Sequence, residues 1–320
     1  MFLTLTPNPC IERTTTWSRL QSTQRINSNH VAVSGGGKAL NSARVAARFG
    51  AQVVATGPLG RRQSLWMTEM CHADGVIPDW VETEADTRFC LNVLHGNGEK
   101  TEIIEDGAPL EFAAATMLLE KWRQLLPKAR LAAIGGSYAP FSDARLQWHA
   151  AMLCDLAAQA DVPVIYDGVD MPFRRALASK SPPWAIKPNL EEAATLLGRT
   201  IETPADERRA VRDLRRKGAE IVLLSCGACG LYAGWSGGIE WFAAPRVETV
   251  SAVGAGDSLV GAFAAKWLET GDVFEAARWG VAAGSASAAQ EKPAFVSRDE
   301  AAALMPQVRH ETREIALHSA

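Results

Sequence analysis

The 320-residue sequence has no apolar run long enough to span a bilayer, and its first residues lack the basic segment and cleavage pattern of a signal peptide. It also lacks an excess of charge, because 33 Lys and Arg oppose 36 Asp and Glu and leave a net charge of −3. Such a chain has no bulk field that favours nucleic acid or an anionic membrane. We expect neither as a partner, so phosphate specificity must come from local basic residues.

Cysteine is also scarce. The six cysteines are scattered and lie mostly in apolar segments, which favours reduced thiols and a cytoplasmic location. Cys226 and Cys229 have CxxC spacing, but a thioredoxin-type pair needs a helix that begins at the motif, and a strand is predicted there instead. A structural zinc site needs a second pair of ligands, which the sequence does not offer. We therefore expect neither a redox nor a metal role for this motif.

Apolar patterning alternates between strands and helices along most of the chain. Strands are predicted near 2–6, 52–56, 131–135, 162–166, 184–187 and 220–225, with hairpins at 87–105 and 230–242. Polar and β-branched residues mix in 11–33, which predicts short strands outside the core. Helices are predicted from about 38 to 49 and near 62–74, 111–125, 142–160, 190–197, 204–217, 257–269, 273–289 and 297–304. This alternation predicts an α/β fold with a mostly parallel sheet and helices on both faces. We expect one domain at 1–305 and a loose polar tail at 306–320.

One glycine-rich stretch, Ser251–Ser258, leads directly into a predicted helix. Gly254–Gly256 would form a tight turn at the helix N-terminus, where the first backbone N–H groups have no partner inside the helix and can bind an anion. Asp257 follows at the mouth of this turn. A carboxylate there repels an anion, but it fits phosphoryl transfer if it takes the proton of the attacking hydroxyl while the amides stabilise the phosphoryl group. The alternative is that Asp257 only caps the helix.

Four further loops follow predicted strands, and open parallel sheets bind ligands at the carboxyl ends of their strands. The first loop carries Glu12, which either accepts hydrogen bonds from a polyol or is a solvated carboxylate. The second, Gly35–Asn41, offers bare backbone together with Lys38 and Asn41, although it matches neither the Walker nor the GxGxxG pattern. A plain helix-entry loop is the alternative for this second segment.

The other two loops come later in the chain. In Lys187–Glu192, a strand ends at Pro188, and Asn189 and Glu192 either form a capping box or order water around Mg²⁺. In Ser225–Gly230, two glycines let a nucleotide phosphate approach backbone amides, unless the segment is only a hairpin turn.

In this order the motifs resemble the PfkB (ribokinase-like) carbohydrate kinases, in the branch of phosphofructokinase, 1-phosphofructokinase and tagatose-6-phosphate kinase. The family pattern G-G-K-G-x-N-x-A-R appears at Gly36–Arg44, K-P-N-x-x-E at Lys187–Glu192, S-x-G-x-x-G at Ser225–Gly230 and V-G-A-G-D-S at Val253–Ser258. The resemblance covers about residues 1–300. It implies a ribokinase-like fold with a small β lid, near 11–33 and 87–105, that pairs two subunits.

The resemblance also implies an activity and a role for each matching residue. ATP would donate its γ-phosphoryl group to a hydroxyl of a sugar phosphate of the fructose 1-phosphate, fructose 6-phosphate or tagatose 6-phosphate type. Asp257 would be the general base, and the amides of Gly254, Ala255 and Gly256 would form the anion hole. The residues implied for the sugar are Glu12, Gly36, Gly37, Lys38 and Asn41, and those implied for its phosphate are Arg25, Arg88 and Ser137. The residues implied for ATP are Lys187, Asn189, Ser225, Gly227, Gly230, Thr249 and Ser285. Asn189 and Glu192 would organise Mg²⁺ through water, and a monovalent cation is a candidate cofactor.

Four positions depart from the family pattern. Glu12 replaces Asp, Ala39 replaces Gly, Cys90 replaces Asn and Ala252 replaces Thr. Glu12 keeps the charge but moves it outward by one methylene, and the Cβ of Ala39 either narrows the pocket or needs a different backbone angle. These changes affect the expected sugar site, so the sequence supports kinase chemistry more firmly than any particular sugar.

Three other functions compete with a sugar-phosphate kinase. A kinase of an unphosphorylated sugar or nucleoside is disfavoured by Arg25 and Arg88, since two basic lid residues suit a phosphate. A sugar-phosphate sensor without catalysis is disfavoured by the intact Gly254–Asp257 motif. A Rossmann dehydrogenase is disfavoured because its fingerprint is missing after the first strand.

Overall fold

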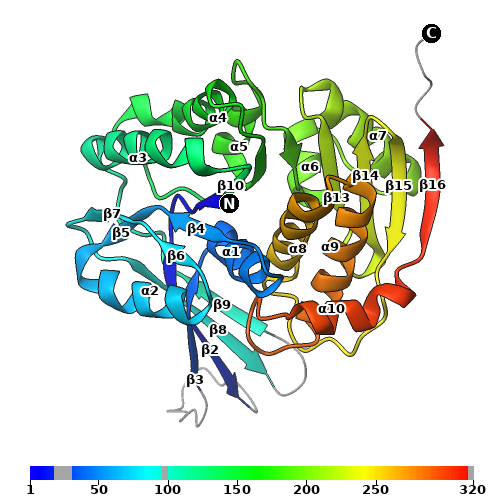
Figure 1. Cartoon of the computed structure of the whole chain (residues 1–320), viewed down its shortest axis with the longest axis horizontal. Coiled ribbons are helices and arrows are strands. Elements are labelled where there is room, and N and C mark those ends of the chain that lie inside the picture. The colour runs from blue at the N-terminus through cyan, green and yellow to red at the C-terminus, as the bar shows by residue number, and fades with distance from the viewer. Residues whose placement is uncertain (18–30, 96–99, 316–320) are drawn as a thin grey trace.

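A ten-stranded sheet forms the centre of the protein, as seen in a computed structural model that describes residues 1–17, 31–95 and 100–315 (Figure 1). The strand order is β16-β15-β14-β13-β12-β11-β10-β1-β4-β6. The parallel strands are β1 (Phe2–Leu5), β4 (Val53–Thr56), β6 (Ile77–Pro78), β10 (Leu131–Gly136), β11 (Val164–Gly168), β12 (Ala185–Ile186) and β13 (Ile221–Ser225). The antiparallel strands at one edge are β14 (Gly230–Trp235), β15 (Gly238–Ala243) and β16 (His310–Ile315). The prediction of a mostly parallel sheet is confirmed.

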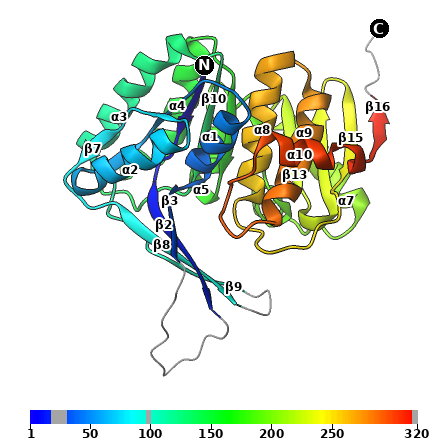
Figure 2. The same cartoon turned by 60° about the horizontal axis from the view of Figure 1, so that its bottom comes forward.

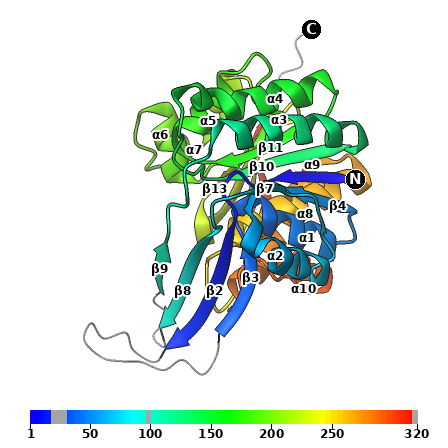
Figure 3. The same ribbon diagram turned by 90° about the vertical axis from the view of Figure 1, so that its left-hand side faces the viewer.

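Two layers of helices cover the two faces of this sheet (Figure 3). One layer contains α3 (Phe112–Leu125), α4 (His149–Gln159), α5 (Asp170–Leu177), α6 (Leu190–Leu197) and α7 (Pro204–Arg216). The other contains α1 (Lys38–Arg48), α2 (Arg61–Ala73), α8 (Ala255–Thr270), α9 (Val273–Ala288) and α10 (Arg298–Leu304). Successive residues of β13 alternate between the two cores, with Ile221 and Leu223 on one side and Val222 and Leu224 on the other. This alternation explains why the central strands read as continuous apolar runs.

A second sheet projects from the body of the molecule, with the order β3-β2-β8-β9 (Figure 2). Its strands are β2 (Cys10–Trp17), β3 (Val31–Gly36), β8 (Arg88–His95) and β9 (Lys100–Ile104). The predicted strands outside the core and the predicted β8–β9 hairpin are confirmed. The turn expected at Gly96–Gly98 lies outside the described residues. A small parallel pair, β5 (Pro58–Gly60) and β7 (Val81–Thr83), lies in the same half of the chain.

Two predictions from the sequence were wrong, one at the C-terminal tail and one between residues 167 and 183. Residues 310–315 form β16 instead of a loose tail, because the outer edge of β15 offers unpaired backbone groups and the ring of His310 packs 4.9 Å from that of Phe274. Residues 316–320 lie outside the described structure. We assigned no helix between 167 and 183, yet α5 begins at Asp170 with Pro172 in its first turn, where proline is tolerated.

The carboxyl ends of the central strands meet the N-termini of α1 and α8. These two helices pack closely because α8 carries Gly261, where a Cβ atom would lie only 2.4 Å from the backbone oxygen of Ser42 on α1. The close approach places Asn41 beside Asp257. None of the helices in residues 1–17, 31–95 and 100–315 combines the length and apolarity that a bilayer crossing requires.

Candidate active site

Asp257 is the third residue of α8, and Gly254 occupies the N-cap position. Gly254 has φ 76°, a left-handed conformation, and a Cβ atom there would lie 2.7 Å from the backbone nitrogen of Ala294. Glycine therefore satisfies both the turn and the close contact. Among the described residues, no side chain caps this helix end. The helix-cap alternative for Asp257 is not supported. No side chain among the described residues occupies the amides of Gly254–Gly256, although the Ala255 N–H donates to the backbone oxygen of Ala252 at 3.3 Å.

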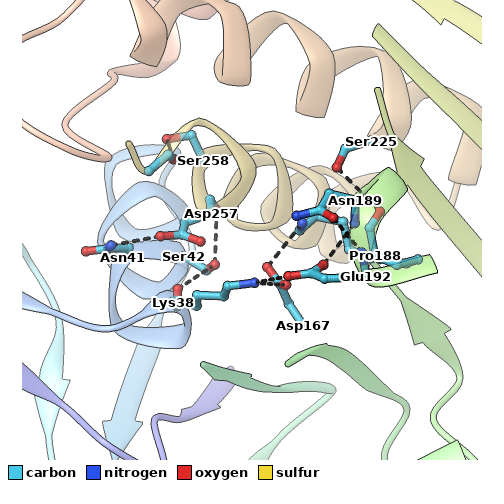
Figure 4. A network of polar contacts seen from close by, with 12 residues as sticks. Lys38, Asn41, Ser42, Asp167, Pro188, Asn189, Glu192, Ser225, Asp257 and Ser258 are labelled. Carbon is cyan, nitrogen blue, oxygen red and sulfur yellow. Dashed lines mark hydrogen bonds and ion pairs between the residues drawn. The ribbon is translucent and has the colours of Figure 1, made fainter. Parts of the chain in front are cut away.

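The carboxylate of Asp257 is buried and held from α1 (Figure 4). Asn41 Nδ2 donates to its Oδ2 at 2.8 Å, and Ser42 Oγ donates to its backbone oxygen at 3.0 Å. Burial, reinforced by the negative charge of Asp167, raises the pKa of Asp257 to about 6, although Lys38 and the Asn41 hydrogen bond oppose this shift. A carboxylate with a pKa near the working pH is suited to general-base catalysis.

Four charged groups lie together beside Asp257 (Figure 4). Lys38 Nζ donates to Asp167 Oδ1 at 2.9 Å and to Glu192 Oε1 at 3.0 Å. Burial opposes the charge on Lys38, but the carboxylates of Asp167 and Glu192 outweigh this and raise its pKa. Lys187 Nζ lies 3.5 Å from Asp167 Oδ2, and a Cβ atom on Gly256 would lie 3.3 Å from the same ammonium. A buried positive charge thus lies against the glycine turn, as an anion site requires.

Asp167 is the functional residue that sequence reasoning missed. It is the penultimate residue of β11, beside β10 and β12 at the carboxyl edge of the sheet, and its Oδ2 accepts no hydrogen bond from the described residues. The available signal was a carboxylate directly after the apolar run Val164–Tyr166, where a buried acid needs partners.

Asn189 and Glu192 form the capping box that was one of the two interpretations of their spacing. Asn189 Oδ1 accepts from the backbone of Glu192 at 2.8 Å, and Glu192 Oε2 accepts from the backbone of Asn189 at 2.9 Å. The box fixes Glu192 with its other oxygen on Lys38. Within the described ranges, no three His, Cys, Asp or Glu side chains group as a metal site. Water-mediated Mg²⁺ binding by this pair remains a prediction, and carboxylate and amide oxygens are suitable ligands for it.

The small sheet supplies a second buried carboxylate. Glu12 is 6% exposed, and its Oε1 accepts from Asn92 Nδ2 at 2.7 Å, whereas its Oε2 is buried and accepts no hydrogen bond within the described part of the chain. Burial raises the pKa of Glu12 against the opposing hydrogen bond from Asn92. In the strand register Cys90 lies opposite Glu12, and Asn92 follows on the same face. The family pattern has Asp and Asn where this chain has Glu12 and Cys90. Here the longer Glu12 side chain accepts from Asn92, two residues after Cys90.

The glycine loop lies against the same carboxylate. Gly36 pairs with Cys10 at the start of β2, and a Cβ atom on Gly36 would lie 3.1 Å from Glu12 Oε2. Gly37 caps α1 with φ 114°. Ala39 lies inside α1, so its side chain does not impose an unusual backbone angle.

Arg88 and Ser137 are placed less directly. Arg88 donates to the backbone oxygens of Glu105 at 2.9 Å and Asn8 at 3.0 Å, and its buried Nε has no partner among the described residues. Arg88 also lines a pocket of about 280 Å³ together with Asn8, Gly107 and Ala139; the lining does not include Asp257. Ser137 follows β10 and is half-buried. Arg25 lies outside the described residues.

The residues expected to bind ATP lie in several segments of the fold. Ser225 ends β13, and its backbone donates to the oxygen of Pro188 at 3.0 Å, which joins two of the predicted loops. Gly227 begins a short 3₁₀ turn, and Gly230 begins β14 with φ 130°. Thr249 is exposed and precedes Val250, which bonds to Ala288 at the end of α9, the helix that carries the buried Ser285.

The CxxC motif lies in the same turn. Cys226 is buried and Cys229 is exposed, and both are free thiols. Burial raises the pKa of Cys226 to about 12, which disfavours its reactive thiolate form.

Comparisons with known proteins converge on one family. Residues 6–300 match the sequence profile of the pfkB family carbohydrate kinases. A 1-phosphofructokinase from Haloferax volcanii is 32% identical over 266 residues, which cover 83% of this chain and 83% of that protein.

Solved structures agree with this match. The phosphofructokinase-2 from Escherichia coli, in complex with substrates and products, has a TM-score of 0.87 and 26% identity over 96% of this chain and 99% of that one. The same enzyme in complex with potassium has a TM-score of 0.87 and 26% identity over 96% and 98% of the two chains. A ribokinase from Arabidopsis thaliana, complexed with ribose and ATP, has a TM-score of 0.74 and 20% identity over 95% and 98%, which supports the fold alone.

Proposed function

The chain belongs to the pfkB family of carbohydrate kinases, and we propose that it transfers the γ-phosphoryl group of ATP to a hydroxyl of a fructose phosphate or a similar ketose phosphate. The observation that carries this proposal is the position of Asp257. Its buried carboxylate, with a pKa raised to about 6, lies in the first turn of α8, directly after Gly254–Gly256, and is held by Asn41 from the glycine loop. A base, an anion site and an acceptor loop thus meet at one point, as phosphoryl transfer requires.

The proposed reaction is a direct in-line transfer without a phosphoenzyme. The carboxylate of Asp257 accepts the proton of the acceptor hydroxyl as its oxygen attacks the γ-phosphorus. A new O–P bond forms, the bond from phosphorus to the β-phosphate oxygen breaks, and ADP leaves. The amides of Gly254, Ala255 and Gly256, with the ammonium of Lys187 against Gly256, stabilise the charge that develops on the phosphoryl oxygens.

Mg²⁺ fits the carboxylates on the nucleotide side of Asp257. Asp167 Oδ2 is buried without a hydrogen-bond partner among the described residues, and Glu192 and Asn189 present further oxygens nearby. We propose that Asn189 and Glu192 hold the ion through water and that Mg²⁺ neutralises phosphate charge there. Potassium is a candidate second cation, since the Escherichia coli relative was solved with it.

The acceptor is proposed to lie between the glycine loop and the small sheet. Glu12 Oε2, which accepts no hydrogen bond from the described residues, suits a sugar hydroxyl, which can donate to it. Gly36, Gly37, Lys38 and Asn41 would complete the sugar site, while Arg88, Ser137 and Arg25 are proposed for the phosphate. The Haloferax volcanii relative, a 1-phosphofructokinase, supports a fructose phosphate. Both terminal nitrogens of Arg88 already donate to backbone carbonyls, which leaves this side chain fewer donors for the phosphate of an acceptor. A kinase of free sugars is therefore the second candidate.

The small sheet is also proposed to pair two copies of the chain. Ile103 and Ile104 on β9 are 57% and 58% exposed, and Val31 on β3 is 46% exposed. Isolated apolar side chains are common on surfaces, but three on one sheet suit a lid that closes against a partner. Because the reaction consumes ATP and all six cysteines are free thiols, we propose a cytoplasmic location.

The direct test measures ADP release with Mg·ATP across a panel of ketose and aldose phosphates and the corresponding free sugars. The variant Asp257→Asn serves as the blank. We expect strong turnover of one phosphosugar that the variant loses. Turnover of free sugars alone would favour the second candidate, and turnover of nothing in the panel would contradict the proposal.

A further inference from the structure

Arg44 on α1 is enclosed almost completely, with an exposed fraction of 1%. Its Nε donates to Asp74 Oδ2 at 2.6 Å, its Nη1 donates to Asn41 Oδ1 at 2.9 Å, and its Nη2 donates to the backbone oxygen of Gly35. Nη1 also reaches the backbone oxygen of Pro293 at 3.5 Å. Arginine is rarely buried to this extent. The four acceptors come from three segments: the Gly35–Asn41 loop, the end of α2 at Asp74, and the segment that contains Pro293. The side chain therefore joins three separate parts of the chain.

The contact with Asn41 decides which way the Asn41 amide faces. Guanidinium is only a donor, so the atom of Asn41 that faces Arg44 must be the carbonyl oxygen. The amide nitrogen then faces Asp257 Oδ2 at 2.8 Å. With the opposite orientation, an amide oxygen would face a carboxylate and an NH₂ group would face a cation, and both contacts would be repulsive. Arg44 thus specifies that Asp257 receives a hydrogen bond, which lowers the pKa of that carboxyl against the effect of burial.

The remaining contacts of Arg44 reach the two glycine segments. Gly35 immediately precedes Gly36, which borders Glu12, and Gly37, which caps α1. Pro293 immediately precedes Ala294, whose backbone nitrogen lies against Gly254. One rigid guanidinium therefore ties the acceptor loop to the turn that forms the anion site.

We propose that Arg44 is a positioning residue for the transfer reaction, acting through Asn41 on Asp257 and through two carbonyls on the glycine loop and the anion-site turn. This inference rests on the proposed function. Arg44 itself is not placed to touch either substrate, since its donors end on the protein.

The test compares Arg44→Lys with the matched control Arg48→Lys. Arg48 lies one turn further along α1, and its guanidinium stacks on the same Phe295 ring, at 4.6 Å against 4.7 Å for Arg44. The described hydrogen bond of Arg48 ends at the backbone of Phe295 instead of at Asn41. Both variants keep a positive charge, but lysine cannot hold several acceptors in a fixed fork.

We expect Arg44→Lys to raise the low-pH midpoint of kcat/KM by about half a unit to one unit, because Asp257 loses the directed hydrogen bond. The corresponding loss of kcat/KM at pH 6 is roughly two- to sixfold, because the parent carboxyl is itself about half ionised there, and the loss at pH 8 is much smaller. Arg48→Lys should leave the midpoint unchanged. Adding Arg44→Lys to an Asn41→Ala background should shift the midpoint no further, whereas a full additional shift would overturn action through Asn41.

Two outcomes separate this inference from the proposed function. If the unmodified chain turns over a sugar phosphate and both lysine variants share its midpoint, the inference is wrong and the function stands. If nothing in the panel is turned over, melting temperatures decide. Asp257→Asn should raise Tm by an amount that increases with pH and then becomes constant. The pH at which it becomes constant must be higher in the Arg44→Lys background and unchanged in the Arg48→Lys background. If Arg44→Lys does not fold, Asp74→Ala removes the acceptor of Arg44 Nε and releases the other end of the guanidinium, and the absence of any upward shift of the midpoint there overturns the inference.

Discussion

Replacing the proposed general base should make the ligand-free protein more stable while it abolishes turnover. Asp257→Asn keeps the shape of the side chain and an oxygen that can accept from Asn41 Nδ2, but it removes a buried charge. General-base catalysis typically contributes about 10²–10⁴-fold, so we expect kcat to fall by at least that factor. Sugar binding should change little, because the loop that holds Asn41 is retained.

The gain in stability follows from the pKa of Asp257. Folding raises this pKa from 3.8 to about 6, and each unit corresponds to roughly 1.4 kcal/mol, so ionised Asp257 costs about 3 kcal/mol of stability. Below about pH 4 the carboxyl is protonated in both the folded and unfolded states, and the difference between variant and parent vanishes. As the pH rises toward about 6, the unfolded chain ionises first, so the parent loses stability relative to the variant. Above about 6 the difference is constant.

Differential scanning fluorimetry or calorimetry from pH 4 to 8 can measure this difference. At roughly 2 cal/mol/K per residue, the 320-residue chain has an unfolding entropy near 0.7 kcal/mol/K, so the Tm of Asp257→Asn should exceed that of the parent by about 4–5 °C above pH 6. A variant that is less stable than the parent at pH 7.5 would refute the claim that burying the charge of Asp257 costs stability. A variant that keeps a near-normal kcat would refute its assignment as the general base.

Four further outcomes are expected. The kcat/KM of the parent should fall about tenfold per pH unit below about 6, since only the ionised carboxylate of Asp257 can accept a proton; a flat profile from pH 5 to 7 would contradict this. Gly254→Ala should lower kcat and Tm together, because its φ of 76° and its 2.7 Å approach to Ala294 exclude a Cβ atom; unchanged kinetics would rule out the turn as the anion site. Glu12→Gln should raise KM for the sugar and leave KM for ATP unchanged, and equal effects on both would remove Glu12 from the sugar site. Arg88→Ala should raise KM for a phosphosugar more than KM for ATP, whereas a loss confined to stability would leave Arg88 as a brace between Asn8 and Glu105.

Local sequence determined the elements and the main motifs of this protein. Strict alternation between apolar strands and amphipathic helices required a parallel sheet covered on both faces, because each element had to bury its apolar side. The glycine turn before Asp257 was also readable, since only glycine adopts the left-handed angle at Gly254 without strain. The capping box at Asn189 and Glu192 was also one of the two interpretations that the sequence allowed, because it depends only on residues three apart at the start of one helix.

Only the tertiary structure decided how residues far apart in the sequence act on one another. Asp167 escaped detection because its partner Lys38 is 129 residues away in the sequence, and its partner Lys187 follows only after α5 and β12. The same holds for Glu12 with Asn92 and for Arg44 with Pro293. The loose tail was mispredicted because β16 is stabilised by the edge of β15 instead of by its own pattern. The sequence determined which reactive side chains were present. The packing of α1 against α8 determined that they meet at Asp257, because the burial of a carboxylate and the charges around it depend on every segment that packs against it.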